Sequence, residues 1–367
     1  MGYDTHVTTY LCTDDIFLQH RPQGDHPERP DRLVAIRRAL AASDLLDRVR
    51  ALAPRPATRE ELLRVHTEAS VAELERRLGP GAPQAASGWL DPDTYFGPGS
   101  YQAALYAAGG ASELALRVYH SERDNGFALV RPPGHHACRD RAMGFCLLNN
   151  IAVAAAAVRA AGGRVAIVDF DVHHGNGTEQ IFLGDPTILF VSTHQYPFYP
   201  GTGAAAVTGL PAPTGDGPHD RDATGTTINI PLPQGSAGDE YMLVFDQVVV
   251  PALRRFAPDV ILVSAGFDGH ARDPLAGMSL VEEDYARMVR ILLSVQPRVA
   301  MILEGGYHPD ALAGSVMSTL RVLLGEPETQ PTRAPVAPAP RSRLAALPTL
   351  EEVRHLAATL QSLHHLR

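Results

Sequence analysis

The stretch VDFDVHHGNGT, residues 168–178, places two aspartates and two histidines in what otherwise looks like a buried β-strand. Buried carboxylates are costly unless an opposite charge compensates them. Asp169, Asp171 and His173 are spaced two residues apart, so in a strand their side chains would share one face. We therefore expect a metal ion to offset the charge of these aspartates.

A second segment could complete this metal site. Asp268, in SAGFDGHARDP, also follows an apolar run. Together, Asp171, His173 and Asp268 would form an open site with room for water, which is the arrangement that a catalytic zinc needs. The alternative is a set of salt bridges between the aspartates and arginines, but basic residues are scarce in these motifs. Two carboxylate ligands also leave iron(II) or cobalt open.

Two adjacent histidines, His135 and His136, follow Pro-Pro-Gly in RPPGHHA and are expected on a turn. A zinc-activated water needs a base, and a leaving amine needs an acid. Asp169 and Asn176 are the available hydrogen-bond partners that could give the two histidines different tasks. A histidine pair on a surface loop is the alternative, and the pair at 364–365, which lacks such surroundings, is assigned no chemistry.

The motif LEGGYHP offers a further reactive group. Gly305 and Gly306 permit a close backbone approach or a positive φ, which would place Tyr307 in a constrained turn. The hydroxyl of Tyr307 could donate a hydrogen bond to a carbonyl oxygen as that oxygen gains charge. Taken alone, a tyrosine here could equally pack beneath the start of a helix.

The elements that must position these residues follow from hydrophobic patterning. Continuous apolar runs predict buried strands at 125–130, 164–172, 187–193, 260–268 and 299–307. Longer stretches predict helices at 27–42, 99–120, 149–161, 239–256, 280–295 and 309–324. Such alternation indicates an α/β fold with one parallel sheet covered on both faces. Ligands bind beyond the carboxyl ends of strands in such a sheet, which is where the polar residues fall.

The composition is that of an ordinary globular protein, with 45% hydrophobic and 20% charged residues. A net charge of −9 argues against nucleic acid and against anionic membranes as partners. The three cysteines form no C-x-x-C pair, the N-terminus has no signal pattern and no apolar run reaches membrane-spanning length. We expect a cytoplasmic protein.

The chain is expected to hold one catalytic domain, residues 1–325, followed by a Pro/Ala-rich linker and a C-terminal helix within 326–367. The tail carries Leu350, Val353, Leu356, Leu360 and Leu363 at helical spacing after a capping Thr349. This helix could pack on the domain or on a partner, and a homo-oligomer stays open. The Gly/Pro/Asp-rich loop 202–224 could form a rim around the site or a surface insertion.

Together these motifs resemble the zinc-dependent histone deacetylase family, including its bacterial members and the acetylpolyamine amidohydrolases. The resemblance covers nearly all of residues 10–325, through DHPERPDRL, DTYFGPGSYQAAL, RPPGHHA, GFCLLNN, DFDVHHGNGT, FYPGTG, SAGFDGHARDPLAG and EGGYHP. It implies the arginase–deacetylase fold, a single central parallel sheet flanked by helices. It also implies hydrolytic removal of acetyl or other acyl groups from the Nε of lysine in proteins or peptides.

The resemblance carries roles onto individual residues. Zinc, one ion per chain, would be held by Asp171, His173 and Asp268, and His136 would be the general base beside an electrostatic His135 held by Asp169. Tyr307 would polarise the carbonyl. A potassium site would comprise Asp169, Asp171, His173, Ser192 and Thr193. The substrate-binding positions are expected at Asp93 (with Asp91 as its rival), Gly144, Phe145, Phe198, Tyr199, Leu275, Gly305 and Gly306.

Two departures from the family pattern are informative. Asn176 faces His136 where one branch of the family has an aspartate, and together with EGGY this indicates the class II and bacterial branch. Because Asn176 lacks a full charge, the imidazolium of His136 should be less stabilised. Leu275 stands where polyamine-selective relatives carry an acidic gatekeeper, which counts against a polyamine specialist.

Three alternatives to a lysine deacylase remain open. The first is a small-molecule amidohydrolase acting on acetylpolyamines or an acylated metabolite. The second is a catalytically silent acyl-lysine-binding protein, against which the intact set of ligands, histidines and Tyr307 argues. The third is an arginase-like two-manganese hydrolase, which a single DxDxHH segment with Asp268 and a tyrosine disfavours.

Overall fold

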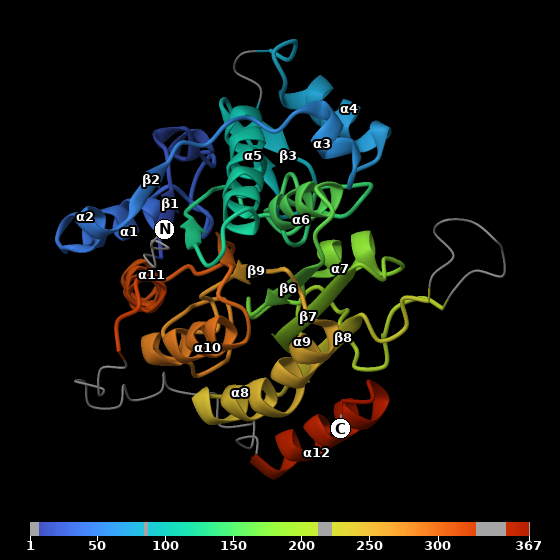
Figure 1. Cartoon of the computed structure of the whole chain (residues 1–367). Helices are drawn as coiled ribbons and strands as arrows, with labels where there is room; N and C mark the ends of the chain where they lie inside the picture. The colour runs from blue at the N-terminus through green and yellow to red at the C-terminus, as the bar shows by residue number, and fades with distance from the viewer. Residues whose placement is uncertain (1–6, 84–86, 212–221, 328–349, 367) are drawn as a thin grey trace, which may run out of the picture.

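A central parallel sheet forms the middle of the molecule, as the sequence predicted (Figure 1). The computed structural model describes residues 7–83, 87–211, 222–327 and 350–366. Within them the sheet has eight strands in the order β2-β1-β5-β10-β9-β6-β7-β8, with every neighbouring pair parallel. The strands are β1 (Thr9–Cys12), β2 (Arg50–Leu52), β5 (Asn125–Ala128), β6 (Val165–Asp169), β7 (Ile188–Gln195), β8 (Thr227–Leu232), β9 (Val260–Ala265) and β10 (Val299–Leu303). A separate hairpin joins β3 (Gly88–Trp89) and β4 (Tyr95–Phe96).

Helices cover both faces of the sheet. Figure 1 shows α5 and α6 on one side and α8, α9, α10 and α11 on the other. The helices are α1 (Asp31–Ala41), α2 (Leu45–Arg48), α3 (Arg59–Leu63), α4 (Glu68–Leu78), α5 (Ser100–Tyr119), α6 (Asn150–Ala160), α7 (Asn176–Phe182), α8 (Gly238–Val244), α9 (Val250–Phe256), α10 (Glu282–Val295), α11 (Pro309–Leu323) and α12 (Leu350–Leu363). A 3₁₀ turn spans Asp15–Gln19, and a π-helical turn, Phe245–Val249, joins α8 to α9 in the segment predicted as one helix.

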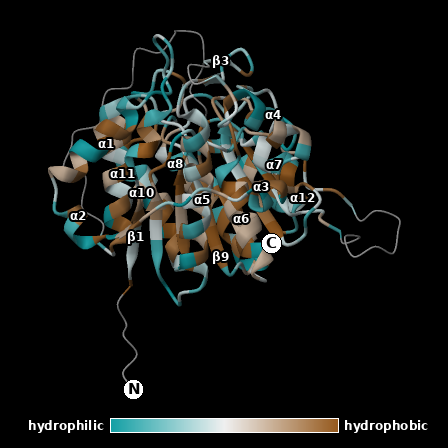
Figure 2. Ribbon diagram, turned by 90° about the horizontal axis from the view of Figure 1, so that it is seen from above, coloured by the Kyte–Doolittle hydropathy of each residue, from teal (hydrophilic) through white to brown (hydrophobic). Residues whose placement is uncertain are grey.

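The central strands are apolar throughout because helices bury both faces of the sheet. All residues of β6, β9 and β10 are buried. Figure 2 shows hydrophobic colouring on and around β9. None of the helices in the described part of the chain is long and apolar enough to cross a lipid bilayer.

The residues that could do chemistry follow four adjacent strands. In the sheet order β5-β10-β9-β6, the loop after β5 carries the histidine pair and the loop after β10 carries Tyr307. The loop after β9 carries Asp268, and the loop after β6 carries Asp171 and His173. Because all four strands are parallel, their carboxyl ends meet at one edge of the sheet.

Several predicted element boundaries are wrong. β6 ends at Asp169, β9 at Ala265 and β10 at Leu303, so the candidate metal ligands Asp171, His173 and Asp268 lie in loops rather than on strands. β1, β2, β8 and the β3–β4 hairpin were not predicted. β1, β2, β3 and β4 are short, and β8 carries Pro231, which an edge strand tolerates.

The C-terminal helix α12 packs back onto the domain, against α8, the π-helical turn and β8. Its buried face consists of Val353, Ala357 and Leu360, and Gln361 Nε2 donates a hydrogen bond to the Gln247 carbonyl at 2.9 Å. His364 is also buried at the end of this face. Thr349 and most of the predicted linker lie outside the described residues, as does the middle of loop 202–224. The described flanks of that loop pair with each other and with Leu183.

Truncating the buried face of α12 should destabilise the protein. Leu360 is fully buried, whereas Leu363 on the same helix is 42% exposed. We expect Leu360→Ala to cost about 2–5 kcal/mol through lost burial and a new cavity, and Leu363→Ala to change stability by less than about 0.5 kcal/mol. Denaturant midpoints of the two variants check this. Equal midpoints would mean that α12 does not contribute its packing to the folded domain.

Candidate metal-dependent active site

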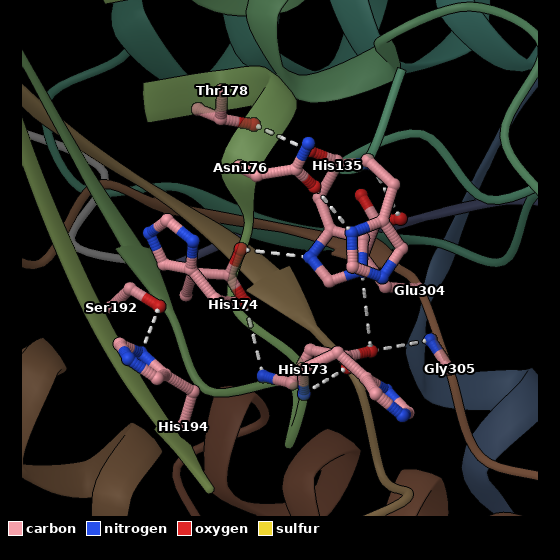
Figure 3. A network of polar contacts seen from close by, with 12 residues as sticks. His135, His173, His174, Asn176, Thr178, Ser192, His194, Glu304 and Gly305 are labelled. Atoms are coloured by element: carbon pink, nitrogen blue, oxygen red, sulfur yellow. Dashed lines mark hydrogen bonds and ion pairs between the residues drawn. The ribbon is translucent and has the colours of Figure 1, made fainter. Parts of the chain in front are cut away.

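Three side chains at the sheet edge present a cluster of possible metal donors. Donor atoms of Asp171, His173 and Asp268 all lie within 4.8 Å of one another. His173 Nδ1 stands 3.1 Å from Asp171 Oδ1 and 3.1 Å from Asp268 Oδ2. Both carboxylates are fully buried, and the His173 side chain is 12% exposed. Figure 3 shows His173 in the same polar network as His135 and Gly305.

Turns of the backbone, rather than strand alternation, bring these side chains together. Asp169 Oδ1 accepts the Asp171 N–H at 3.1 Å, and Asp171 Oδ1 accepts the His173 N–H at 2.9 Å. Such links to the residue two positions on are typical of aspartate-stabilised turns. Asp268 Oδ1 accepts the Val172 N–H at 2.9 Å, which ties the loop after β9 to the loop after β6.

Glycine is required where the backbone passes the carboxylates. The Gly305 N–H donates to Asp171 Oδ2 at 2.8 Å. A Cβ at Gly305 would lie 2.0 Å from Asp268 Oδ2, and one at Gly266 would lie 1.9 Å from Asp171 Oδ2. Neither contact is sterically tolerable, so both glycines let the chain wrap closely around the charged groups.

The electrostatics of the cluster fit a divalent cation. Burial, followed by the charge of Asp171, raises the pKa of Asp268. Burial alone would lower the pKa of His173, but the carboxylates of Asp268 and Asp171 outweigh it and raise that pKa to about 10. Two carboxylates and an imidazole thus face one another, and a cation between them would offset the repulsion between the two negative charges. Oxygen and imidazole donors in this number match an open zinc site.

The two histidines after β5 have different partners. His135 Nδ1 lies 3.0 Å from Asp169 Oδ2, and His136 Nδ1 lies 2.8 Å from Asn176 Oδ1. Because a carboxamide oxygen only accepts, His136 Nδ1 must carry the hydrogen, and Nε2 is then the basic nitrogen. The Asn176 amide group points towards sulfur, with Nδ2 3.4 Å from Cys138 Sγ.

The charges around them also shift the pKa values of the two histidines in opposite directions. Burial opposes protonation of His135, but Asp171 and Asp169 raise its pKa to about 10. Burial, followed by the positive charge of His135 and His173, lowers the pKa of His136 well below its ordinary value. His135 is therefore suited to hold a positive charge, and His136 to be a neutral proton acceptor.

Tyr307 is held above the cluster by contacts on several sides. Its ring lies under the Arg32 guanidinium, 4.9 Å from the ring centroid, and meets Phe145 edge-on at 5.8 Å. Burial raises the pKa of its phenol well above the ordinary value, so the hydroxyl stays a hydrogen-bond donor. Gly306, predicted to contact substrate, is not among the residues that line the pocket. It has a φ of 118°, and its carbonyl accepts a hydrogen bond from Arg32 Nε at 2.6 Å.

A pocket of about 210 Å³ leads to these groups. Its walls include most of the predicted substrate-binding residues and both histidines: Asp93, Pro133, His135, His136, Gly144, Phe145, His173, Phe198, Tyr199, Leu275, Gly305 and Tyr307. Asp91 instead caps the adjoining turn, where its Oδ1 accepts the N–H groups of Asp93 and Thr94. None of the described residues of loop 202–224 lines this pocket.

The residues expected to hold a monovalent cation are adjacent and buried. Asp169 on β6 is paired in register with Ser192 on β7, and Thr193 Oγ1 donates to the Asp169 carbonyl at 3.3 Å. The Ser192 hydroxyl contacts His194 Nδ1 at 2.9 Å (Figure 3).

Sequence analysis missed a buried ionic cluster behind the pocket. Glu28 pairs with Arg131 and, at 3.2 Å, with Arg32, and all three side chains are buried. Arg32 in turn donates to the carbonyls of Glu304 and Gly306, next to Tyr307. Glu28 and Arg32, in DHPERPDRL, were the only sign of this cluster in the sequence. The partner of Glu28, Arg131, lies 103 positions away, so the pairing leaves no local pattern.

Comparisons with known proteins show which family the chain belongs to. Residues 26–323 match the histone deacetylase domain. The chain is 38% identical over 342 residues to a probable deacetylase of Archaeoglobus fulgidus, covering 88% of this chain and 90% of that protein. It is 39% identical over 323 residues to the polyamine deacetylase HDAC10 of Homo sapiens, covering 85% of this chain but only 46% of that protein.

A solved structure is similar over almost its whole length. The crystal structure of the HDA15 HD domain matches with a TM-score of 0.84 at 34% identity, covering 98% of this chain and 95% of that chain. The fold is therefore the arginase–deacetylase fold, as predicted. The chain belongs to the histone deacetylase family and is a hydrolytic deacetylase, and this family is generally zinc-dependent.

Adding a methyl group at Gly305 should weaken metal binding. In Gly305→Ala the new Cβ would displace the Asp268 carboxylate. We expect metal affinity to fall about 10–100-fold, the usual effect of disturbing the support of a metal ligand. Competition with a chromogenic chelator measures this directly. Gly81→Ala, which has no atom within 4 Å of its added Cβ, is the control, and equal affinities would show that Gly305 does not support the metal site.

Proposed function

We propose that this deacetylase removes acetyl or other acyl groups from the Nε of lysine in proteins or peptides. The observation that carries the proposal is one narrow pocket that contains His136, His173 and Tyr307 together, behind aromatic walls from Phe145 and Tyr199. Such walls suit the apolar stem of an acyl-lysine side chain, and Asp93 at the pocket wall could accept hydrogen bonds from substrate backbone.

We propose zinc as the metal, held by Asp171, His173 and Asp268. When bound, it would polarise the amide carbonyl and lower the pKa of a water molecule. The proposed site for a potassium ion comprises Asp169, Asp171, His173, Ser192 and Thr193, which would hold the ion mainly through their backbone carbonyls. This assignment rests on the family resemblance and on the adjacency of β6 and β7.

The residues of the chain move the protons. His136 Nε2 takes a proton from the attacking water while Asn176 holds its Nδ1–H. The Tyr307 phenol donates a hydrogen bond to the carbonyl oxygen as it becomes negative. The protonated His136 then gives its proton to the leaving amine, so that water and amide become carboxylate and amine. His135, held by Asp169, would stabilise the negative charge that develops nearby.

Removing the Tyr307 hydroxyl should slow turnover without emptying the metal site. We expect Tyr307→Phe to lower kcat on an acetyl-lysine peptide about 10²–10³-fold, the usual cost of losing one oxyanion donor. Metal content, measured by mass spectrometry, should match that of the unaltered protein because Tyr307 is not a ligand. Full turnover in Tyr307→Phe would refute the role given to this phenol.

A polyamine deacetylase is the second candidate, favoured by the 39% identity to HDAC10. Both reactions use the same groups, so the difference must lie at the mouth of the pocket. Leu275 lines the pocket and offers no charge to a distal ammonium group. The absence of a charge at Leu275 favours acyl-lysine peptide as the substrate. The experiment that decides is a comparison of turnover on acyl-lysine peptides of several acyl chain lengths and on acetylpolyamines, with enzyme of known metal content.

Placing a carboxylate at Leu275 should shift this preference. We expect Leu275→Glu to raise kcat/KM for acetylspermidine relative to acetyl-lysine peptide roughly tenfold, which corresponds to about 1.4 kcal/mol of charge attraction. Leu275→Gln, of similar size but uncharged, is the matched control. If both variants behave alike, charge at this position does not select the substrate.

A further inference from the structure

Asp273 connects two parts of the pocket wall that come from different loops. It lies in the loop after β9, is 8% exposed, and contacts backbone on both sides. Oδ1 accepts the Leu275 N–H at 3.0 Å, and Oδ2 accepts the Tyr307 N–H at 2.6 Å and the His308 N–H at 3.3 Å. One carboxylate therefore joins the loop of Leu275 to the loop of Tyr307.

The two carboxylate oxygens of Asp273 bind different loops, which fixes the orientation of the side chain. The bond to Leu275, two residues on, is a local turn contact that sets the direction of the carboxylate. Oδ2 is then presented to the loop after β10. Among the described residues, no arginine or histidine side chain pairs with Asp273, and its carboxylate oxygens are held by backbone N–H groups.

The backbone before Tyr307 needs such an anchor. Gly306 has a φ of 118°, a conformation open mainly to glycine, and glycine allows the chain many others. Arg32 binds the carbonyls of Glu304 and Gly306 and covers the Tyr307 ring, and Asp273 holds the Tyr307 N–H on the other side of Gly306. Without that bond, the turn could rotate and carry the phenol away from the reacting carbonyl.

We propose that Asp273 is a positioning residue for the Tyr307 phenol. The inference rests on the proposed function, in which that phenol donates to the carbonyl oxygen. Asp273→Asn tests it, because the amide has the same shape but one acceptor fewer. Its NH₂ group must face an N–H donor on one side, so one of the two loop contacts is lost.

A double-mutant cycle with Tyr307→Phe distinguishes positioning from a general structural role. We expect Asp273→Asn alone to lower kcat on acetyl-lysine peptide roughly tenfold to a hundredfold, as a misplaced catalytic group does. In the Tyr307→Phe background it should cost less than about twofold, because no hydroxyl remains to be placed. An equal loss in both backgrounds, or loss of bound metal in Asp273→Asn, would overturn the proposal.

Asp284→Asn is the matched control. Asp284 is also 8% exposed and also accepts a backbone N–H, from Val281 at 3.0 Å, but it caps α10 instead of the Tyr307 turn. It should lower the thermal midpoint without changing kcat. Should Asp273→Asn fail to fold, Asp273→Glu, which keeps both acceptors but moves them by one methylene, enters the same cycle with the same criterion.

The cycle also separates this proposal from the proposed function. If Tyr307→Phe alone keeps full turnover, the role of the phenol is wrong, whatever Asp273 does. If Tyr307→Phe loses turnover and Asp273→Asn has the same effect with and without the hydroxyl, only the positioning role fails.

Discussion

The negative charge of Asp171 and Asp268, buried side by side at the carboxyl edge of the sheet, constrains everything around it. Isolated carboxylates are not stable in such surroundings. The chain compensates them with backbone N–H groups, with His173 and with a geometry suited to a cation. The N–H groups of Val172 and Gly305 bind a carboxylate of a neighbouring loop, so satisfying the charge also fixes the turn at Gly305 and hence the start of the Tyr307 loop.

The same charge explains why two adjacent histidines behave differently. His135 faces Asp169 and lies near Asp171, which favours its protonated form, and this positive neighbour then disfavours protonation of His136. A neutral partner, Asn176, leaves that difference intact while fixing which ring nitrogen of His136 is basic. An aspartate in place of Asn176 would raise the pKa of His136 and reduce the contrast between the pair.

Sequence reasoning located the site better than it located the elements. Asp171, His173 and Asp268 could be found because charged groups inside apolar runs are chemically conspicuous. The predicted meeting of strand ends at one edge of the sheet is observed, but the strand alternation expected at Asp169, Asp171 and His173 is not, since β6 ends at Asp169 and turns complete the approach. The side chains of Asp169 and Asp171 bind nearby backbone N–H groups, and such bonds compete with strand pairing. Hydrophobic patterning cannot predict these bonds. The edge strand β8 was missed because Pro231 and the polar residues Thr227 and Asn229 interrupt its apolar run.

The buried cluster of Glu28, Arg131 and Arg32 shows what patterning cannot supply. Ion pairs at this depth contribute little net stability, because desolvation offsets their attraction. Arg32, however, also donates to the carbonyls on both sides of Gly305 and covers the Tyr307 ring. An apolar side chain could fill the same volume but could not bind those carbonyls. The cluster is therefore better explained by the geometry that it imposes on the Tyr307 turn than by a contribution to stability. Arg32 lies more than 270 positions before the carbonyls that it binds, so the sequence gives no local sign of this contact.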